Sequence, residues 1–205
     1  MSAAVRVVLV LALHACNPIA AVAQELEPRI PARALPWRKT VHAEVRRQWG
    51  LQLPTVAIQV AAGTLHQESG WRPAAQSSHA KGFAQFTDPT WSDMVKLDPS
   101  IATIGDVWNP QASIRAMALY HRRLVELYRD VSADVRWQFA LSGYNGGPGW
   151  TNRDRTRCRK VPGCNASVWF GHVEKHSARA AWALKENRHY VDVIWNRWRV
   201  LYERF

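Results

Sequence analysis

The amino-acid sequence predicts one mainly α-helical domain. Apolar residues recur at helical spacing in several segments, and residues typical of helix starts and stops stand between these segments. The chain has 205 residues, is 47% hydrophobic and contains 11 tryptophans. This length fits a single core, and this composition argues against disorder.

The first 23 residues have the pattern of a signal peptide. Arg6 supplies a positive charge, residues 7–15 form an apolar segment, and residues 21–23 offer a cleavage site of small residues. The apolar segment is far shorter than the roughly 20 residues of a membrane span. We therefore expect an exported protein, periplasmic or extracellular. The alternative is lipidation at Cys16, which would make the protein an outer-membrane lipoprotein with peripheral membrane contact.

The expected elements of the N-terminal part end at Glu68. Residues 24–37 contain three prolines among small and charged residues, which predicts a mobile leader. A helix is expected over residues 39–49, with Gly50 as its stop. Pro54 fits the first turn of a second helix, whose last residue is Glu68.

One wall of a cleft is expected after this second helix. Gly70 and Pro73 end the helix, and the residues that follow are rich in Ser, Gly, Ala and Pro without a clear period. Residues 71–90 are therefore predicted to form short strands or an irregular loop, a kind of segment that often carries binding residues.

Three more helices are predicted towards the C-terminus. Asn109 is a good cap for a helix that begins at Pro110. Ser132 can cap a further helix, which the glycines and proline of residues 144–149 break. The last helix covers residues 190–202 and has a tryptophan-rich face.

Glu68 has the clearest potential for chemistry. A carboxylic acid beside Trp71 and ahead of a backbone turn is what general acid catalysis on a sugar needs. Trp71, Phe83 and Phe86 could provide a partly apolar setting that raises the pKa of Glu68, so that it is protonated when substrate binds. From its position alone, Glu68 could instead be a solvated glutamate at a helix end.

Four sequence blocks follow one another between Glu68 and Val191. The first consists of Glu68, Ser69, Trp71, Pro73, Ala75 and Ser77, followed by Gly82, Phe83 and Gln85. The others are Asn109, Pro110, Ser113, Ile114, Ala116 and Tyr120, then Ala140 with residues 144–148, then residues 186–191. In this order the blocks resemble the soluble lytic transglycosylases, lysozyme-like enzymes that cut the glycan strands of bacterial peptidoglycan.

The chain also departs from the family pattern. The spacing from Ser77 to Gly82 is one residue shorter than usual, which predicts a differently shaped cleft wall there. The second block lacks a usual glycine. The block at residues 144–149 and the tryptophan-rich tail are most similar to phage-type or prophage-type members.

The resemblance implies a lysozyme-like domain over residues 38–205 that needs no cofactor. An ordinary glycosidase places two carboxylates around the scissile bond, but the acids nearest in sequence, Asp88, Asp93 and Asp98, lie outside the blocks. The family implies that Glu68 works alone. It protonates the glycosidic oxygen between N-acetylmuramic acid (MurNAc) and N-acetylglucosamine (GlcNAc), then accepts the proton of the sugar's own 6-hydroxyl, which leaves a 1,6-anhydro-MurNAc end.

The candidates for substrate binding are Ser69, Trp71, Gln85, Phe86, Tyr144, Asn145 and Tyr190. Trp71 is the tryptophan most expected at the site, because most of the others should pack in the core. Ser69 and Gln85 could instead stabilise turns. Tyr144 could be a buried core residue, and Tyr190, like Glu186, could pack the final helix.

Cys158 and Cys164 remain after signal-peptide cleavage. They are separated by five residues that include a Pro-Gly turn, which predicts a disulfide in an oxidising compartment. Two unpaired thiols are the alternative. No metal site is expected, because the spacing is not Cys-x-x-Cys and the pair His172 and His176 lacks a clear third ligand.

The net charge of +11 predicts a polyanionic partner. Lys and Arg concentrate in residues 29–47 and 153–160. For an exported protein this charge fits acidic envelope polymers or phospholipid head groups, and no nucleic-acid partner is expected because no binding motif accompanies it. Besides peptidoglycan strands, an envelope-spanning or phage lysis assembly is a candidate partner.

Two other functions fit the same residues. A hydrolytic muramidase, or lysozyme, on this scaffold would use water positioned by a second group and would leave reducing muramic ends. A non-catalytic peptidoglycan-binding scaffold protein would keep the cleft but would not need the acid. The presence of Glu68 therefore favours an enzyme.

Overall fold

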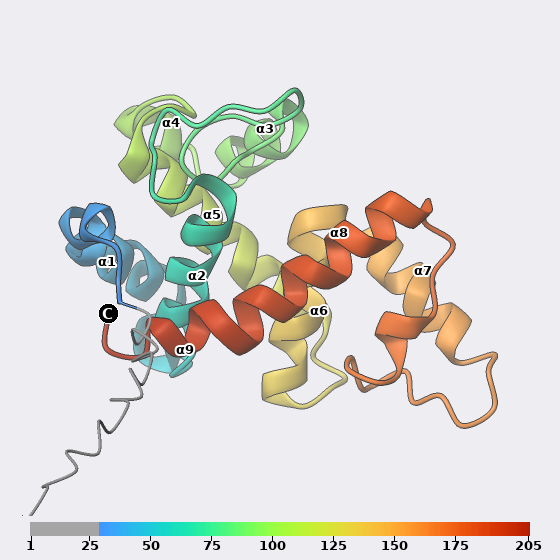
Figure 1. Ribbon diagram of the computed structural model, residues 1–205. Coiled ribbons are helices and arrows are strands. Elements are labelled where there is room, and N and C mark those ends of the chain that lie inside the picture. The colour runs from blue at the N-terminus through green and yellow to red at the C-terminus, as the bar shows by residue number, and fades with distance from the viewer. Residues whose placement is uncertain (1–28) are drawn as a thin grey trace, which may run out of the picture.

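The computed structural model describes residues 29–205 (Figure 1). The expected signal peptide, Cys16 and the first residues of the leader lie outside the described residues. The prediction of a mainly helical class is confirmed, since the described residues form helices and no sheet. No helix in residues 29–205 combines the length and the apolar character that crossing a membrane requires.

The leader differs from the expected mobile segment over its second half. Residues Ala32–Trp37 form a 3-10 helix, η1. Ala34 is buried, and the Trp37 ring packs edge-on against Phe83 with centroids 5.1 Å apart. The tryptophan gives this segment an apolar anchor on the core, which composition alone did not indicate.

The first two α-helices lie close to their predicted positions. Helix α1 covers Arg38–Trp49, and a short 3-10 turn, η2, follows at Gly50–Gln52. Helix α2 covers Ala57–Ser69, so it begins three residues after Pro54. Gly70 ends it in the left-handed conformation, with φ of 56°, which glycine adopts without strain.

Residues 71–87 form the expected irregular loop. Two isolated antiparallel bridges, Gln76 to Lys81 and Lys81 to Phe86, hold it together. The loop ends slightly earlier than predicted, because Thr87 caps helix α3, Asp88–Leu97. A short helix that the sequence did not indicate, α4, follows at Ser100–Ile104.

Three helices form the middle of the chain. Helix α5 covers Pro110–Leu127, and the Asn109 side chain caps it as predicted by accepting from the amides of residues 111 and 112. Helix α6 covers Ala133–Gly146, so it extends into the segment that was expected to break it. The break is Gly147 alone, with φ of 84°, because Pro148 starts helix α7, Pro148–Cys158, at once.

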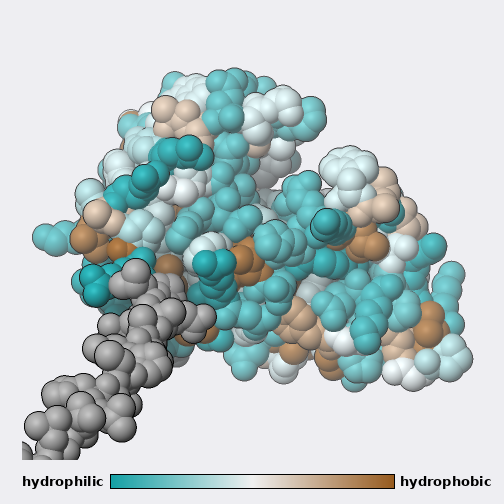
Figure 2. Space-filling view, viewed as in Figure 1, coloured by the Kyte–Doolittle hydropathy of each residue, from teal (hydrophilic) through white to brown (hydrophobic). Residues whose placement is uncertain are grey.

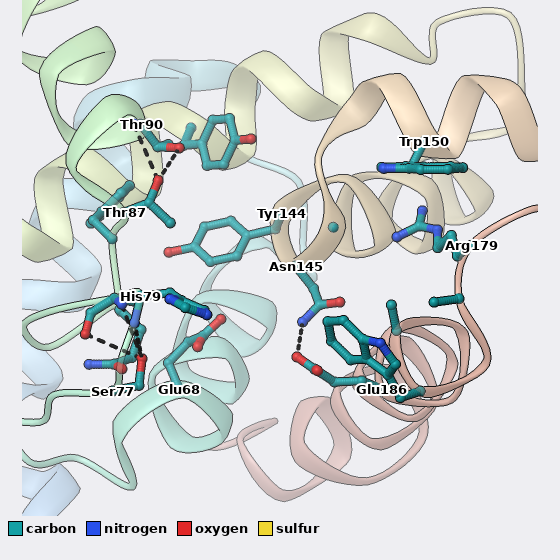
Figure 3. A pocket seen from close by; sticks show the side chains of 18 residues that line it. Glu68, Ser77, His79, Thr87, Thr90, Tyr144, Asn145, Trp150, Arg179 and Glu186 are labelled. Carbon is teal, nitrogen blue, oxygen red and sulfur yellow. Dashed lines mark hydrogen bonds between the residues drawn. The ribbon is translucent and has the colours of Figure 1, made fainter.

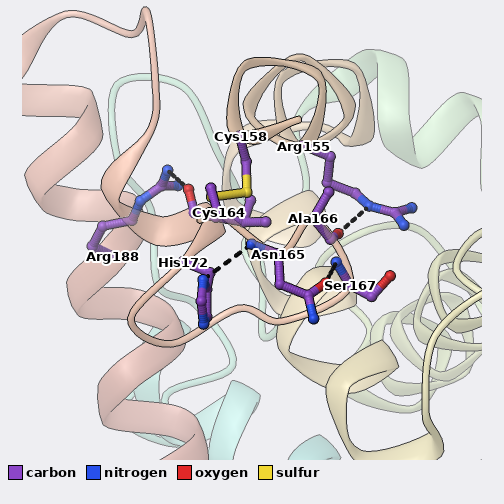
Figure 4. The surroundings of a disulfide bond; sticks show 9 residues. Arg155, Cys158, Cys164, Asn165, Ala166, Ser167, His172 and Arg188 are labelled. Carbon is purple, nitrogen blue, oxygen red and sulfur yellow. Dashed lines mark hydrogen bonds between the residues drawn. A yellow bond between two sulfur atoms is a disulfide. The ribbon is translucent and has the colours of Figure 1, made fainter. Parts of the chain in front are cut away.

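The predicted disulfide is present between Cys158, at the end of α7, and Cys164 (Figure 4). The two Cα atoms lie 5.4 Å apart. Next to the bridge, the ring of His172 accepts a hydrogen bond from the Asn165 amide at 3.1 Å. The bridge thus closes a small loop ahead of η3, Val173–Lys175.

The C-terminal helix consists of three consecutive segments, two α-helical and one π-helical. Helix α8 covers Ala181–Asp192, a π-helical segment η4 covers Val193–Trp198, and α9 covers Arg199–Leu201. In Figure 1 it crosses the molecule past α6 and α2. A Cβ at Gly63 on α2 would lie 3.0 Å from the Trp198 Cβ, so this glycine permits close packing of the two helices.

Candidate active site

A cleft of about 670 Å³ opens between two groups of helices. Figure 2 shows it as a hollow between the upper part of the molecule, which contains α3 and α4, and the part on the right that contains α7 and α8. One wall comes from the end of α2, the 77–90 segment and Tyr120. The other comes from the end of α6, Trp150 and residues 179–186.

Glu68 lies in the last turn of α2, and its side chain points into this cleft (Figure 3). The Tyr190 hydroxyl donates a hydrogen bond to Glu68 Oε1 at 2.6 Å. Burial raises the pKa of Glu68 to about 8, against the lowering effect of the Tyr190 hydrogen bond, and the Glu186 carboxylate adds to the rise. Glu68 is therefore largely protonated at neutral pH.

Two stacked tyrosines, Tyr144 and Tyr190, lie near Glu68. Tyr144 and Tyr190 are stacked, with centroids 6.4 Å apart and ring planes 8° apart. The Tyr144 hydroxyl donates to the Ala84 carbonyl at 2.9 Å, which ties α6 to the loop on the opposite wall. Tyr190 is buried and reaches Glu68 across 122 residues of sequence.

The side chain of Asn145 forms hydrogen bonds with two residues of α8. Its Nδ2 donates to Glu186 Oε1 at 3.2 Å, and its Oδ1 accepts from Asn187 Nδ2 at 2.9 Å. Asn187 is buried and also donates to the Ser142 carbonyl at 2.9 Å. Asn145 lines the cleft with its orientation fixed, because both ends of its amide have partners.

The structure corrects the placement of Trp71. This side chain is 2% exposed, does not line the cleft, and donates from its indole nitrogen to the Tyr202 hydroxyl at 2.6 Å. Phe83 is also buried in the core, with its ring 5.8 Å from that of Trp71. Gly70 and Trp71 both have positive φ, so the chain reverses and directs the indole into the core.

Ser69 also faces away from the cleft. Its hydroxyl is buried and donates to the Leu65 carbonyl at 3.0 Å. Gln85 does line the cleft, but its Nε2 donates to the carbonyls of Ala75 and Gly82 at 2.8 and 2.9 Å. Both side chains hold local backbone, the alternative that the sequence left open.

Phe86 is where the sequence predicts it, on the cleft wall. Its ring lies 5.7 Å from Trp91 and 6.3 Å from Tyr144. With Tyr120 on the same wall and Tyr144 on the opposite wall, it gives the cleft near Glu68 an apolar character. Phe86 and these tyrosines therefore provide the aromatic surface near Glu68 that the sequence analysis expected from Trp71.

Several cleft residues carried no functional assignment in the sequence. They are His79, Trp150, Arg179, Trp182 and Glu186. Glu186 belongs to the last sequence block, at residues 186–191, and membership of this block was the only feature of the sequence that pointed to a functional position. Trp182 is 73% exposed, and nothing in its local sequence separates it from the many packed tryptophans.

Within residues 29–205, no group of three or more His, Cys, Asp or Glu side chains is placed to hold a metal ion. The His172 ring contacts the backbone of the disulfide loop. The groups that line the cleft are the carboxyls of Glu68 and Glu186, the His79 imidazole, the Arg179 guanidinium, aromatic rings, hydroxyls and amides.

A mainly helical domain whose cleft contains a buried glutamate with a raised pKa has the features that general acid catalysis on a glycan requires. Residues 51–163 match the family model of the transglycosylase SLT domain. The match covers more than half of the chain, and the chain belongs to this family of lytic transglycosylases that act on peptidoglycan. The search for similar curated proteins finds no match. The block at residues 186–191, with Tyr190, lies beyond the matched region.

Proposed function

We propose that this protein cleaves the β-1,4 bond between MurNAc and GlcNAc without water and leaves a 1,6-anhydro-MurNAc end. The observation that carries the proposal is Glu68, which stands in the cleft with a pKa raised to about 8. A general acid with a pKa near the working pH keeps its proton until the transition state needs it.

In the first half of the reaction, Glu68 gives its proton to the glycosidic oxygen. Tyr190 donates to Oε1, so Oε2 is the oxygen free to carry the proton toward the substrate. The bond between that glycosidic oxygen and C1 of MurNAc breaks, and the GlcNAc leaves as an alcohol. The Tyr190 hydrogen bond also stabilises the carboxylate that forms.

In the second half, the Glu68 carboxylate accepts the proton of the MurNAc 6-hydroxyl while its oxygen bonds to C1. This step regenerates the protonated acid and consumes no water. One residue thus serves as acid and then as base. Because Glu68 must begin protonated, kcat/KM should fall as the pH rises through about 8.

The strand should lie along the cleft between its two walls. Phe86, Tyr120 and Trp182 offer aromatic faces on which sugar rings can stack. Asn145 can orient the N-acetyl group, because its amide is fixed by Glu186 and Asn187. Ser69 and Trp71 are left out of the binding surface, since both face the core.

The substitution Glu68→Gln tests the assigned role. It keeps the shape of the side chain but removes the transferable proton, so turnover should fall by about 10² to 10⁴. Binding to purified peptidoglycan should stay within a few fold of the wild type. A folded variant that binds and still cleaves at the native rate would refute the role and would favour a scaffold function with a contaminating activity.

A hydrolytic muramidase is the second candidate, and Glu186 favours it. This exposed carboxylate lines the same cleft and acts electrostatically on Glu68. In that mechanism Glu186 would activate a water molecule, so Glu186→Gln would abolish activity. In the transglycosylase mechanism the same variant keeps most of its activity, because the 6-hydroxyl replaces water.

We also propose that the protein is exported through residues 1–23. Peptidoglycan lies outside the cytoplasm, so the substrate of the family supports this route. The N-terminal residue of the mature protein tests it, with Gln24 as the expected result. A lipid-modified Cys16 at the N-terminus would contradict cleavage after Ala23 and would indicate a lipoprotein.

A further inference from the structure

Arg179 lies on the floor of the cleft, beyond Asn145 as seen from Glu68 (Figure 3). Its side chain is 4% exposed. Within residues 29–205 its Nη2 lies 3.4 Å from Asp154 Oδ2 as a long ion pair without hydrogen-bond geometry, and its Nε is buried without a hydrogen-bond partner. Buried donors of this kind cost free energy unless something binds them.

Arg188, which approaches the same aspartate as Arg179, provides a comparison with an arginine whose hydrogen bonds are all within the protein. Both arginines approach the fully buried Asp154, Arg188 at 2.9 Å and Arg179 at 3.4 Å. Arg188 also donates to the Glu174 carbonyl at 2.7 Å and to Asn187 Oδ1 at 2.8 Å. Arg188 is thus fully engaged in packing, and one carboxylate facing two guanidinium groups leaves a net positive charge.

Gly146 makes room for the Arg179 guanidinium. A Cβ at this position would clash with Arg179 Nη1 and would lie 3.1 Å from Asn187 Nδ2. The last turn of α6 can therefore carry no side chain here while Arg179 stays in place. The close approach fixes the arginine on the cleft floor at the side of Asn145.

Aromatic rings flank this positive charge. The Cζ of Arg179 lies 5.8 Å from the centre of the Trp150 ring, and that of Arg153 lies 4.8 Å from it. Trp182 lines the same part of the cleft and is 73% exposed. A cleft that contains an exposed indole and a buried cation with incomplete hydrogen bonding suits a ligand that has both a sugar ring and a carboxylate.

We propose that Arg179 binds a carboxylate carried by the lactyl arm of a muramic sugar, at a subsite formed with Trp150 and Trp182. This subsite rests on the proposed function, since it needs a glycan strand in the cleft. The carboxylate has two sources, the free lactyl group of a strand without peptides or a carboxylate of an attached stem peptide. Either carboxylate would add a hydrogen-bond partner to a guanidinium that the structure pairs only loosely, with Asp154.

Binding measurements in the Glu68→Gln background test the subsite, because the strands stay intact there. Three ligands of equal length are titrated calorimetrically: peptide-bearing strands, strands freed of peptide by an amidase, and a neutral GlcNAc oligosaccharide. Adding Arg179→Gln should weaken binding of at least one carboxylated strand about tenfold and leave the neutral oligosaccharide within twofold. The strand that loses affinity identifies the source of the carboxylate.

Two control variants separate this role from packing and from net charge. Arg153→Gln removes an exposed charge near the same indole and should not change the preference. Arg179→Lys keeps the positive charge and should keep part of the preference for carboxylated strands. Equal losses on charged and neutral ligands, or no loss on either carboxylated strand, would overturn the subsite. If no glycan binds even with Arg179 intact, the proposed function itself fails.

Discussion

The two walls of the cleft differ in how they are built. Apart from Tyr120, the wall that begins at Glu68 comes from one stretch of chain, so most of its residues stand together in the sequence. The opposite wall combines the end of α6, the start of α7 and α8, and its residues are spread from Tyr144 to Glu186. Glu68 belongs to the first wall, and α8 supplies the two residues that act on its pKa, the buried Tyr190 and the cleft-lining Glu186. In the proposed mechanism, catalysis therefore depends on residues more than a hundred positions from the acid.

Among the substitutions considered on α8 and the second wall, Tyr190→Phe should lower the catalytic rate most. It removes the hydrogen bond to Glu68, so the carboxylate is less stabilised and kcat should fall about 10- to 100-fold with little change in KM. The same hydrogen bond lowers the pKa of Glu68, so the fall of kcat/KM at alkaline pH should move to higher pH.

Tyr144→Phe is the matched control for this experiment. The Tyr144 hydroxyl donates to the Ala84 carbonyl and not to Glu68, so the alkaline limb of its pH profile should stay in place. If both variants shift the limb equally, the effect comes from the stacked rings. The hydrogen bond to Glu68 would then not be its cause.

Trp182→Ala should weaken binding of glycan strands about five- to tenfold, because it removes an exposed stacking face from the second wall. Its melting temperature should stay near that of the wild type. Trp71→Phe is the contrasting variant on the first wall: it loses the bond to Tyr202 and should lower stability by about 1–2 kcal/mol. If folded Trp71→Phe lost affinity for glycan strands and Trp182→Ala did not, Trp71 would be a substrate-binding residue after all.

Glu186→Gln should have the smallest effect on rate, within about threefold below pH 7. Its carboxylate raises the pKa of Glu68, so removing the charge lets Glu68 lose its proton more easily. The fall of kcat/KM should therefore begin at a lower pH than in the wild type. An inactive variant that still binds strands would instead identify Glu186 as the base of a hydrolase.

Local signals in the sequence predicted a good part of this structure. Asn109 caps α5, Gly70 ends α2, and the two cysteines form their bridge, because each of these features depends on residues a few positions apart. Glu68 was singled out in the same way, at the head of a short block, and it lines the cleft, while its catalytic role stays a prediction. Phe86 was also placed correctly on the cleft wall.

Features that depend on tertiary packing were not predictable in this way. Trp71 points to the core because two successive residues take positive φ, and the sequence gives no rule for the second of them. Tyr144 and Asn145 are helical because only Gly147 breaks the helix. The contact between Tyr190 and Glu68, and the position of Arg179 beside Gly146, exist only after α8 packs on α2 and α6.

The mass of the released ends tests the central claim most directly. Purified wild-type protein is incubated with peptidoglycan, and the soluble muropeptides are measured by mass spectrometry. A lone Glu68 that uses the 6-hydroxyl predicts 1,6-anhydro-MurNAc ends, which are absent from the digest made by Glu68→Gln. Reducing MurNAc ends, one water heavier, would contradict the account and would show that the second wall supplies an activated water.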